Sequence, residues 1–247
     1  MILKTEALVL KTMDFRETSR IATFYTRDYG KLSGVLKGIR RDPRKFGSSV
    51  EKFSLNEIVF YQYRSADLHL ISQCDMRQDF YPIRQDLKKI MAASYMAELI
   101  EKILPSEEPN QELFDVLLDF LNSLAEARDI DFLIYMLQIK VLSLSGFRPH
   151  LDVCLKCGQP ITSGARFGLE AGGLICSRCP LIEGKPQPIT PGTIATLLYI
   201  EKHSWSLCQK LRLTVLVRRE LKYILNQFLR YHLQRHIQSE RFLHPSS

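Results

Sequence analysis

The sequence has few of the features that mark specialised classes of protein. No stretch reaches the roughly 18 unbroken apolar residues of a membrane-spanning helix, and the N-terminus lacks the basic segment and apolar core of a secretory signal. Twelve glycines and 11 prolines in 247 residues do not suit a collagenous chain, and six cysteines are too few for a disulfide scaffold of this length. We therefore expect a globular cytoplasmic protein with reduced cysteines.

Common catalytic motifs are also missing. The sequence contains no G-x-x-x-x-G-K-[ST], G-x-G-x-x-G, G-x-S-x-G or H-E-x-x-H. Without a cluster of acids, histidines or lysines that resembles an active site, a binding protein fits better than an enzyme. The pair Asp129-x-Asp131 leaves open a metal-dependent nuclease, although Asp131 is more simply the N-cap of a helix.

The charge that is present is unevenly distributed. Lys and Arg number 34 against 27 Asp and Glu, a net charge of +7. Residues 1–80 carry a net charge of +4, residues 81–150 carry −4, and residues 151–247 carry +7. Basic surface favours a polyanionic partner, because each neutralised phosphate releases counterions. Solvated basic faces are the alternative.

The first 75 residues have the pattern of a β-domain. Five segments rich in strand-forming residues alternate with turn residues, at 6–11, 19–26, 30–36, 56–63 and 67–73. Five short strands suit a small closed or nearly closed barrel, for which the oligonucleotide-binding (OB) fold is the commonest arrangement. Apolar stripes at helical spacing predict helices between residues 83 and 145. The acids between residues 101 and 112 are expected to form a solvated face.

A basic loop follows the third predicted strand. Between residues 37 and 49, five residues are basic and one is acidic, and Gly, Pro and Ser indicate a loop. Cations that track phosphates, beside a ring that stacks on a base, are typical of single-stranded nucleic-acid binding. The predicted nucleic-acid-binding residues are Lys37, Arg40, Arg41, Arg44, Lys45 and Phe46. A solubilising loop, with the ring in the core, is the alternative.

Four cysteines give the most specific motif. Cys154, Cys157, Cys176 and Cys179 have the spacing C-x2-C-x18-C-x2-C. Two such knuckles supply the four thiolates of a tetrahedral zinc site, and a filled coordination sphere predicts a structural ion. Disulfides, redox chemistry and a metal-free knuckle are weaker alternatives in this setting. Cys74 and Cys208 lie outside the motif and are expected to be buried.

The C-terminal residues return to a helical pattern. Thr190-Pro191 predicts a helix start, and an apolar stripe from about residue 207 predicts a last helix that packs on the middle helices. Arg218, Arg219 and Lys222 cluster on that helix and could face phosphate or an acidic partner. We predict four segments: a barrel at 1–80, a helical domain at 81–150, a zinc finger inserted at 151–184, and the rest of the helical domain at 185–247.

The chain resembles the RecO family of bacterial DNA-repair proteins over nearly its whole length. The stretches that carry the resemblance are Glu6-Ala7-Leu8-Val9-Leu10, Phe15-Arg16-Glu17-Thr18-Ser19-Arg20-Ile21, Tyr29-Gly30-Lys31-Leu32, Lys37-Gly38-Ile39-Arg40-Arg41, and Gly146-Phe147-Arg148-Pro149 before the first cysteine pair. It implies a recombination mediator that binds single- and double-stranded DNA, anneals complementary strands, and helps to load recombinase onto strands coated by single-stranded DNA-binding protein (SSB).

Partners follow from the same resemblance. They are DNA, RecR and the acidic C-terminal tail of SSB, with no membrane and no small-molecule substrate. Our hypothesis places the SSB tail in a basic-rimmed groove on the last helix, at Arg218, Arg219 and Lys222. The resemblance also implies a bacterial cytoplasmic protein that associates with the nucleoid when it acts. A zinc-ribbon RNA-binding protein of transcription or the ribosome is a further alternative.

Overall fold

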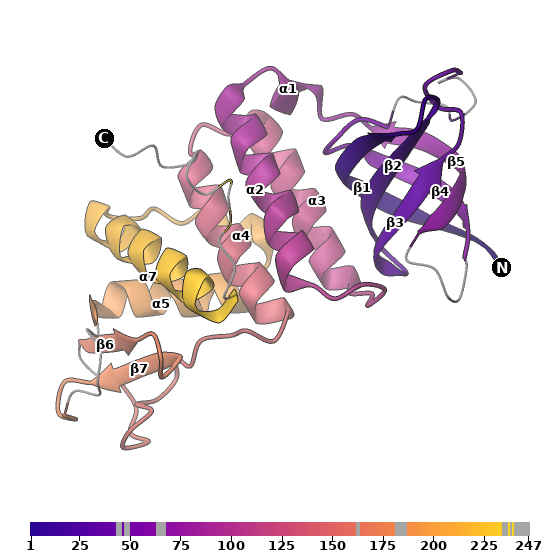
Figure 1. Ribbon diagram of the computed structural model, residues 1–247. Coiled ribbons are helices and arrows are strands. Elements are labelled where there is room, and N and C mark those ends of the chain that lie inside the picture. Colours follow the sequence, from indigo (N-terminus) through magenta and orange to yellow (C-terminus); the bar gives the residue numbers. More distant parts are fainter. Residues whose placement is uncertain are drawn as a thin grey trace. The chain divides into compact units, whose positions relative to one another are not determined.

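The chain forms two compact units in the computed structural model (Figure 1). The structure describes residues 1–42, 46, 50–62, 68–161, 164–180, 187–233, 237 and 239. Unit 1 is Met1–Arg128 with Ile237–Ser247, and unit 2 is Asp129–His236. Within the described ranges, no helix has both the length and the apolar character needed to cross a membrane.

Unit 1 begins with a closed barrel of five strands. The strands are β1 (Ile2–Phe15), β2 (Ser19–Thr26), β3 (Gly30–Leu36), β4 (Leu55–Tyr61) and β5 (His69–Gln78). Long β1 pairs with β4 through its first half and with β2 through its second half, and a parallel pairing of β3 with β5 closes the barrel in the order β1-β2-β3-β5-β4. This is an OB-like barrel, as the strand pattern predicted.

Alternating side chains fill the barrel. Along β3, every second residue from Gly30 to Leu36 is buried, as expected for a strand with one face toward a core. The core residues include Val9, Phe24 and Phe60, and Cys74 is fully buried among them as expected. Burial raises the pKa of the Cys74 thiol to about 12, so this cysteine stays protonated and unreactive.

The barrel of unit 1 is followed by the helices α1 (Tyr81–Arg84), α2 (Leu87–Ile103) and α3 (Gln111–Glu126). Figure 1 shows α2 and α3 lying side by side. Asp86 caps α2 and Asn110 caps α3, each with a side-chain oxygen that accepts backbone N–H bonds. Pro82 lies in the first turn of α1, where backbone N–H groups have no acceptor within the helix, so the N–H that proline lacks is not needed.

Polar contacts join the barrel to the helices of unit 1. Lys31 Nζ donates to the carbonyl oxygens of Glu101 (2.6 Å) and Leu104 (2.5 Å), which belong to the unpaired C-terminal end of α2. His69, only 2% exposed, lies 3.0 Å from the carboxylate of Glu107. Glu107 itself is exposed, as expected for the solvated acidic face that the sequence predicted. At Gly30, with φ +66°, a Cβ would lie 2.3 Å from the carbonyl oxygen of Glu108, so only glycine fits.

The described residues of unit 2 form four helices and a small sheet. The helices are α4 (Ile130–Leu144), α5 (Pro191–Lys202), α6 (Trp205–Cys208) and α7 (Val215–Leu233), and the strands are β6 (Ala165–Gly168), β7 (Gly173–Cys176) and β8 (Gln187–Ile189). Helix α4 is apolar nearly all round and packs against α5 and α7 as the central helix. Cys208 is fully buried, as expected.

The units divide the helices differently from the predicted segments. We predicted one helical part at 81–150, whereas the boundary between compact units falls after Arg128, between α3 and α4. The contacts of Lys31 and His69 explain why α2 and α3 belong with the barrel. The last helix also begins at Val215 rather than near residue 207, because Thr214 accepts the N–H of Val217 at 3.3 Å and caps α7 there.

Candidate metal centre and nucleic-acid interface

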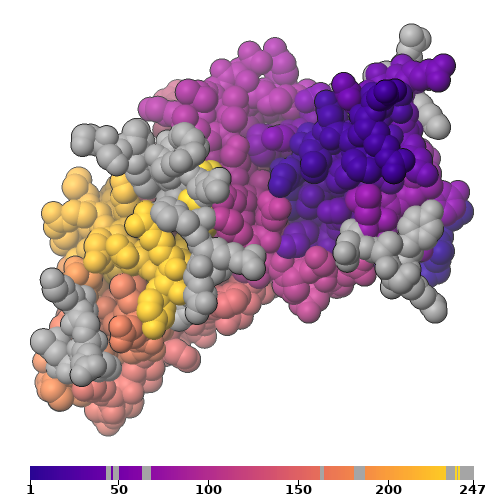
Figure 2. Space-filling model, in the orientation of Figure 1, coloured from indigo at the N-terminus to yellow at the C-terminus, as the bar shows by residue number. Residues whose placement is uncertain are grey.

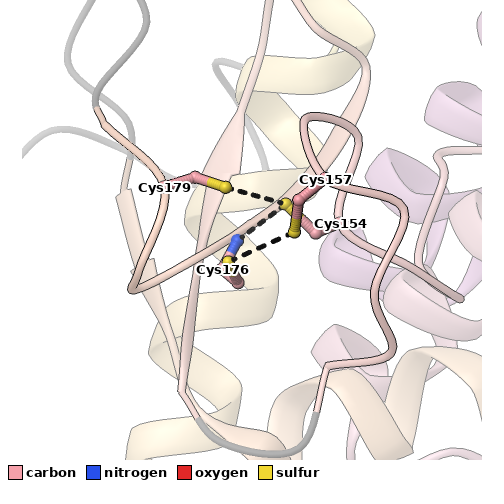
Figure 3. A group of neighbouring side chains, drawn as sticks. All are labelled: Cys154, Cys157, Cys176 and Cys179. Atoms are coloured by element: carbon pink, nitrogen blue, oxygen red, sulfur yellow. Dashed lines mark hydrogen bonds between the residues drawn. The ribbon is translucent and has the colours of Figure 1, made fainter.

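The four cysteines of the motif come together in unit 2 (Figure 3). Cys154 and Cys157 lie on the loop before β6, Cys176 ends β7, and Cys179 lies in the turn that follows. Their sulfur atoms lie within 4.8 Å of one another, and among the described residues they form the one such group of three or more potential ligands. All six cysteines of the chain are free thiols.

The spacing of the sulfur atoms fits a tetrahedral metal ion. Zinc–sulfur bonds of about 2.3 Å in a tetrahedron place the sulfur atoms about 3.8 Å apart. The Sγ atoms of Cys154 and Cys179 are 3.8 Å apart, and those of Cys157 and Cys176 are 3.9 Å apart. Four soft thiolates with this geometry are a donor set for Zn²⁺ that leaves no position for water or substrate.

Backbone groups prepare two of the thiols for a metal. Burial alone would raise the pKa of Cys154, but N–H groups that include that of Cys176, whose nitrogen is 3.3 Å away, outweigh it and lower the pKa to about 6. The pKa of Cys176 is lowered for the same reason, with burial again acting against the backbone donors. Thiolates rather than thiols bind metals, so these N–H donors stabilise the ligand form.

The turn after β3 presents the predicted cations of the barrel. Lys37, Arg40 and Arg41 are all exposed. Arg40 lies 3.6 Å from Asp14 and donates to the carbonyl oxygen of Arg16 at 3.3 Å, so part of its charge is compensated. Within the described ranges, the side chains of Lys37 and Arg41 have no ion pair. Arg44 and Lys45 lie outside the described residues.

Phe46 does not fit the predicted stacking role. Its side chain is 2% exposed and belongs to the barrel core with Ile39 and Val50. The core is where a ring of this size removes most apolar surface from water, and a buried ring offers no face to a base. Tyr29, the other ring considered, packs edge-on against Phe60.

Two of the three predicted cations on α7 share a hollow. Arg219 and Lys222 are exposed, and within the described part of the chain neither forms an ion pair. The hollow has a volume of about 280 Å³, and its remaining lining residues are Tyr223, Asn226, Gln227 and Arg230. Part of this helix is visible in yellow in Figure 2. Lys222, Tyr223 and Asn226 follow Arg219 by three, four and seven residues, spacings that bring side chains to one face of a helix. The sequence could therefore have indicated these additional residues.

The third cation, Arg218, is paired with an acid. Its guanidinium donates to both carboxylate oxygens of Asp129, at 3.0 and 2.5 Å, and lies 5.9 Å from the ring centre of Phe132. The bidentate pair holds Arg218 against the start of α4, so it is not available to a partner in this arrangement. Glu220, the one acid within α7, accepts from Thr190 and Thr193 and fixes the start of α5.

The same contacts argue against the pair Asp129 and Asp131 as a metal site. Asp129 rather than Asp131 is the N-cap of α4, accepting the N–H of Phe132 at 3.2 Å. Hydrogen bonds from Arg218 lower the pKa of Asp129 despite partial burial. Its oxygens are therefore already engaged with an arginine and the helix terminus. Asp131 lies in the first turn of the helix instead.

Matches to protein families agree with this architecture. The model for "Recombination protein O N terminal" matches residues 1–80, which contain the barrel, and that for "Recombination protein O C terminal" matches residues 84–241. The chain belongs to the RecO family. Together the two models cover both compact units and the cysteine cluster.

Individual relatives extend over nearly the whole chain. The proteins named DNA repair protein RecO from Syntrophus aciditrophicus and Pelotomaculum thermopropionicum are 31% and 32% identical, each over 97% of this chain, and over 94% and 93% of their own lengths. The protein of that name from Alkaliphilus metalliredigens is 30% identical over 95% of both chains. Membership of the RecO family places the chain in DNA repair and recombination.

Proposed function

We propose that this protein is a recombination mediator that makes and breaks no covalent bond. It binds single- and double-stranded DNA, anneals complementary strands, and acts with RecR to load recombinase onto SSB-coated strands in the cytoplasm, at the nucleoid. The observation that carries the proposal is the group of exposed cations, Lys37, Arg40 and Arg41, on an OB-like barrel in a RecO-family chain. OB-folds commonly bind single strands through such basic surfaces.

Annealing follows from charge neutralisation. Two complementary strands repel each other through their phosphates, and cations that neutralise phosphates reduce this repulsion so that bases can pair. The direct test is annealing of complementary strands coated with SSB, measured with and without RecR. The rate should rise when the protein is added, whereas an unchanged rate in both conditions would contradict the proposal.

We assign the cysteine cluster to one structural zinc ion. Cys154, Cys157, Cys176 and Cys179 would hold it with four thiolates, and the sulfur spacing of 3.8–3.9 Å supports this donor set. When bound, the ion supplies a rigid cross-link between the loop before β6 and the end of β7. Structural zinc of this kind contributes to folding rather than to chemistry.

The hollow on α7 is our proposed site for the acidic tail of SSB. Arg219 and Lys222 supply positive charge, and the exposed ring of Tyr223 supplies apolar surface. An acidic peptide with apolar residues is complementary to this combination. Because Arg218 is held by Asp129, the tail is expected to use Arg219 and Lys222 and not the full triplet first considered.

Charge reversal tests this site. We expect Arg219→Glu with Lys222→Glu to weaken binding of a fluorescent SSB-tail peptide by tenfold or more, since two attractive charges become repulsive. Arg212→Glu is the control, because Arg212 is exposed in the same unit but outside the hollow. Unchanged peptide affinity in the double variant, or an equal loss of affinity in Arg212→Glu, would show that the SSB tail does not bind at α7.

A further inference from the structure

The second cysteine knuckle is held by a residue that is not a metal ligand. Arg166 lies on β6, the central strand of the sheet β7-β6-β8, opposite Ile175 and Pro188. Its Nη2 donates to the carbonyl oxygen of Cys179 at 2.7 Å and to that of Cys176 at 3.1 Å. A third carbonyl, that of Ser177, lies 3.5 Å from the same nitrogen.

These contacts fix the turn between two metal ligands. The carbonyl groups of Cys176 and Cys179 belong to the residues whose sulfur atoms complete the cluster. Restraining both carbonyls limits the backbone torsions that aim the two thiolates at one point. A knuckle that is already ordered loses less conformational entropy when a metal binds, and groups outside the coordination sphere commonly orient ligands in this way.

The charge of Arg166 also suits an occupied cluster. Four thiolates around one Zn²⁺ carry a net charge of −2, and a nearby guanidinium opposes that charge at a site where Cys154 and Cys176 are buried. Moreover, Arg166 Nε is buried and has no hydrogen-bond partner among the residues that the structure describes. Burial of an unpaired guanidinium N–H is unfavourable. A negatively charged metal cluster would offset that cost.

We propose that Arg166 is a positioning residue of the metal centre, which raises its affinity for zinc and slows the release of the ion. This inference rests on the proposed zinc cofactor, and it assigns a role to a side chain that does not touch the metal. Phe167, the next residue on β6, contacts Phe228 of α7, with ring centres 5.8 Å apart. Because successive side chains of a strand point to opposite faces, the substitution of Arg166 leaves that contact in place.

The test compares three variants of the full chain. Arg166→Met removes the donors and the charge, Arg166→Lys retains the charge without the planar fork, and Arg178→Met is the matched control. Arg178 lies within the same knuckle and is exposed, and its side chain has no hydrogen bond or ion pair among the described residues. The measurements are the zinc affinity by chelator competition and the rate of zinc release into excess chelator.

The expected result is a selective effect on the metal. Arg166→Met should lower zinc affinity about 10- to 100-fold, the usual range for groups that orient ligands, and should speed release. Arg166→Lys should lie between Arg166→Met and wild type, and Arg178→Met should stay within about threefold of wild type. At saturating Co²⁺, Arg166→Met should still show the absorption bands of a four-thiolate site, and circular dichroism should show unchanged helix content.

Each contrary result has one meaning. If the wild type binds one zinc ion and Arg166→Met binds it equally well, the role of Arg166 is wrong while the zinc assignment stands. If Arg178→Met loses as much zinc affinity as Arg166→Met, the loss comes from the general positive charge and not from the hydrogen bonds of Arg166 to the knuckle. That result also overturns the proposal. If the wild type binds no zinc, both inferences fail. If Arg166→Met does not fold, the test rests on Arg166→Lys. A wild-type zinc affinity and release rate in Arg166→Lys would contradict the positioning role of Arg166.

Discussion

Replacing Cys176 with alanine is expected to abolish stable zinc binding and to unfold the β6–β7 hairpin. Cys176 ends β7, and its sulfur lies 3.9 Å from that of Cys157. Three thiolates cannot complete the tetrahedron, and structural zinc contributes an apparent binding free energy of about 10–16 kcal/mol in small zinc-finger peptides. Metal analysis after dialysis should show one zinc ion per wild-type chain and almost none in Cys176→Ala, together with a lower melting temperature.

Cys208→Ala is the matched control for the loss of a cysteine. Cys208 is fully buried in the same unit but lies outside the metal cluster. Its substitution removes a small apolar side chain and should reduce stability modestly without loss of zinc. Full zinc occupancy in Cys176→Ala, or an equal loss of zinc in Cys208→Ala, would show that the four cysteines do not form the site.

Neutralising two cations on the barrel is expected to make DNA binding less dependent on salt. Lys37 and Arg41 are exposed and have no ion pair within the described ranges. If each neutralises one phosphate of a single strand, Lys37→Gln with Arg41→Gln should reduce the slope of log K against log salt by about 1.4, because each contact contributes about 0.7. Fluorescence titrations with single-stranded DNA at several salt concentrations measure this slope.

The control pair carries the same charge on the same barrel. Lys4 and Arg77 each lie 2.8 Å from the carboxylate of Glu57. Neutralising them changes the net charge by the same amount but removes cations that share the carboxylate of Glu57 and are partly compensated by it, so the slope should stay closer to the wild-type value. Equal changes in the two double variants would mean that the turn after β3 has no special role in DNA binding.

Local patterns were sufficient to predict the barrel and the cysteine cluster. The alternation of buried and exposed residues in β3 follows from strand geometry alone, and the spacing of Cys154, Cys157, Cys176 and Cys179 brings the two knuckles together. Both features depend on residues close together in the sequence or on a motif with a fixed geometry. The start of α5 at Pro191, after Thr190 as N-cap, was predictable for the same reason.

Long-range contacts decided the features that the sequence did not predict. Asp129 and Asp131 both lie at the start of an apolar helix, and the pairing of Asp129 with Arg218, 89 residues away, distinguishes them. Phe46 lies in a basic segment of the sequence, yet its ring is buried in the barrel core. The role of Arg166 depends on carbonyl groups that meet it only when the hairpin forms. No local pattern in the sequence records these contacts.

The central claim is that the protein pairs DNA strands without cleaving them. The most direct measurement mixes end-labelled complementary strands with the protein in the presence of Mg²⁺ and follows both duplex formation and strand length. We predict faster duplex formation with every strand recovered at full length, and a smaller acceleration by Lys37→Gln with Arg41→Gln. Unaccelerated pairing, or shortened strands whose appearance is lost in Asp129→Asn with Asp131→Asn, would contradict the account.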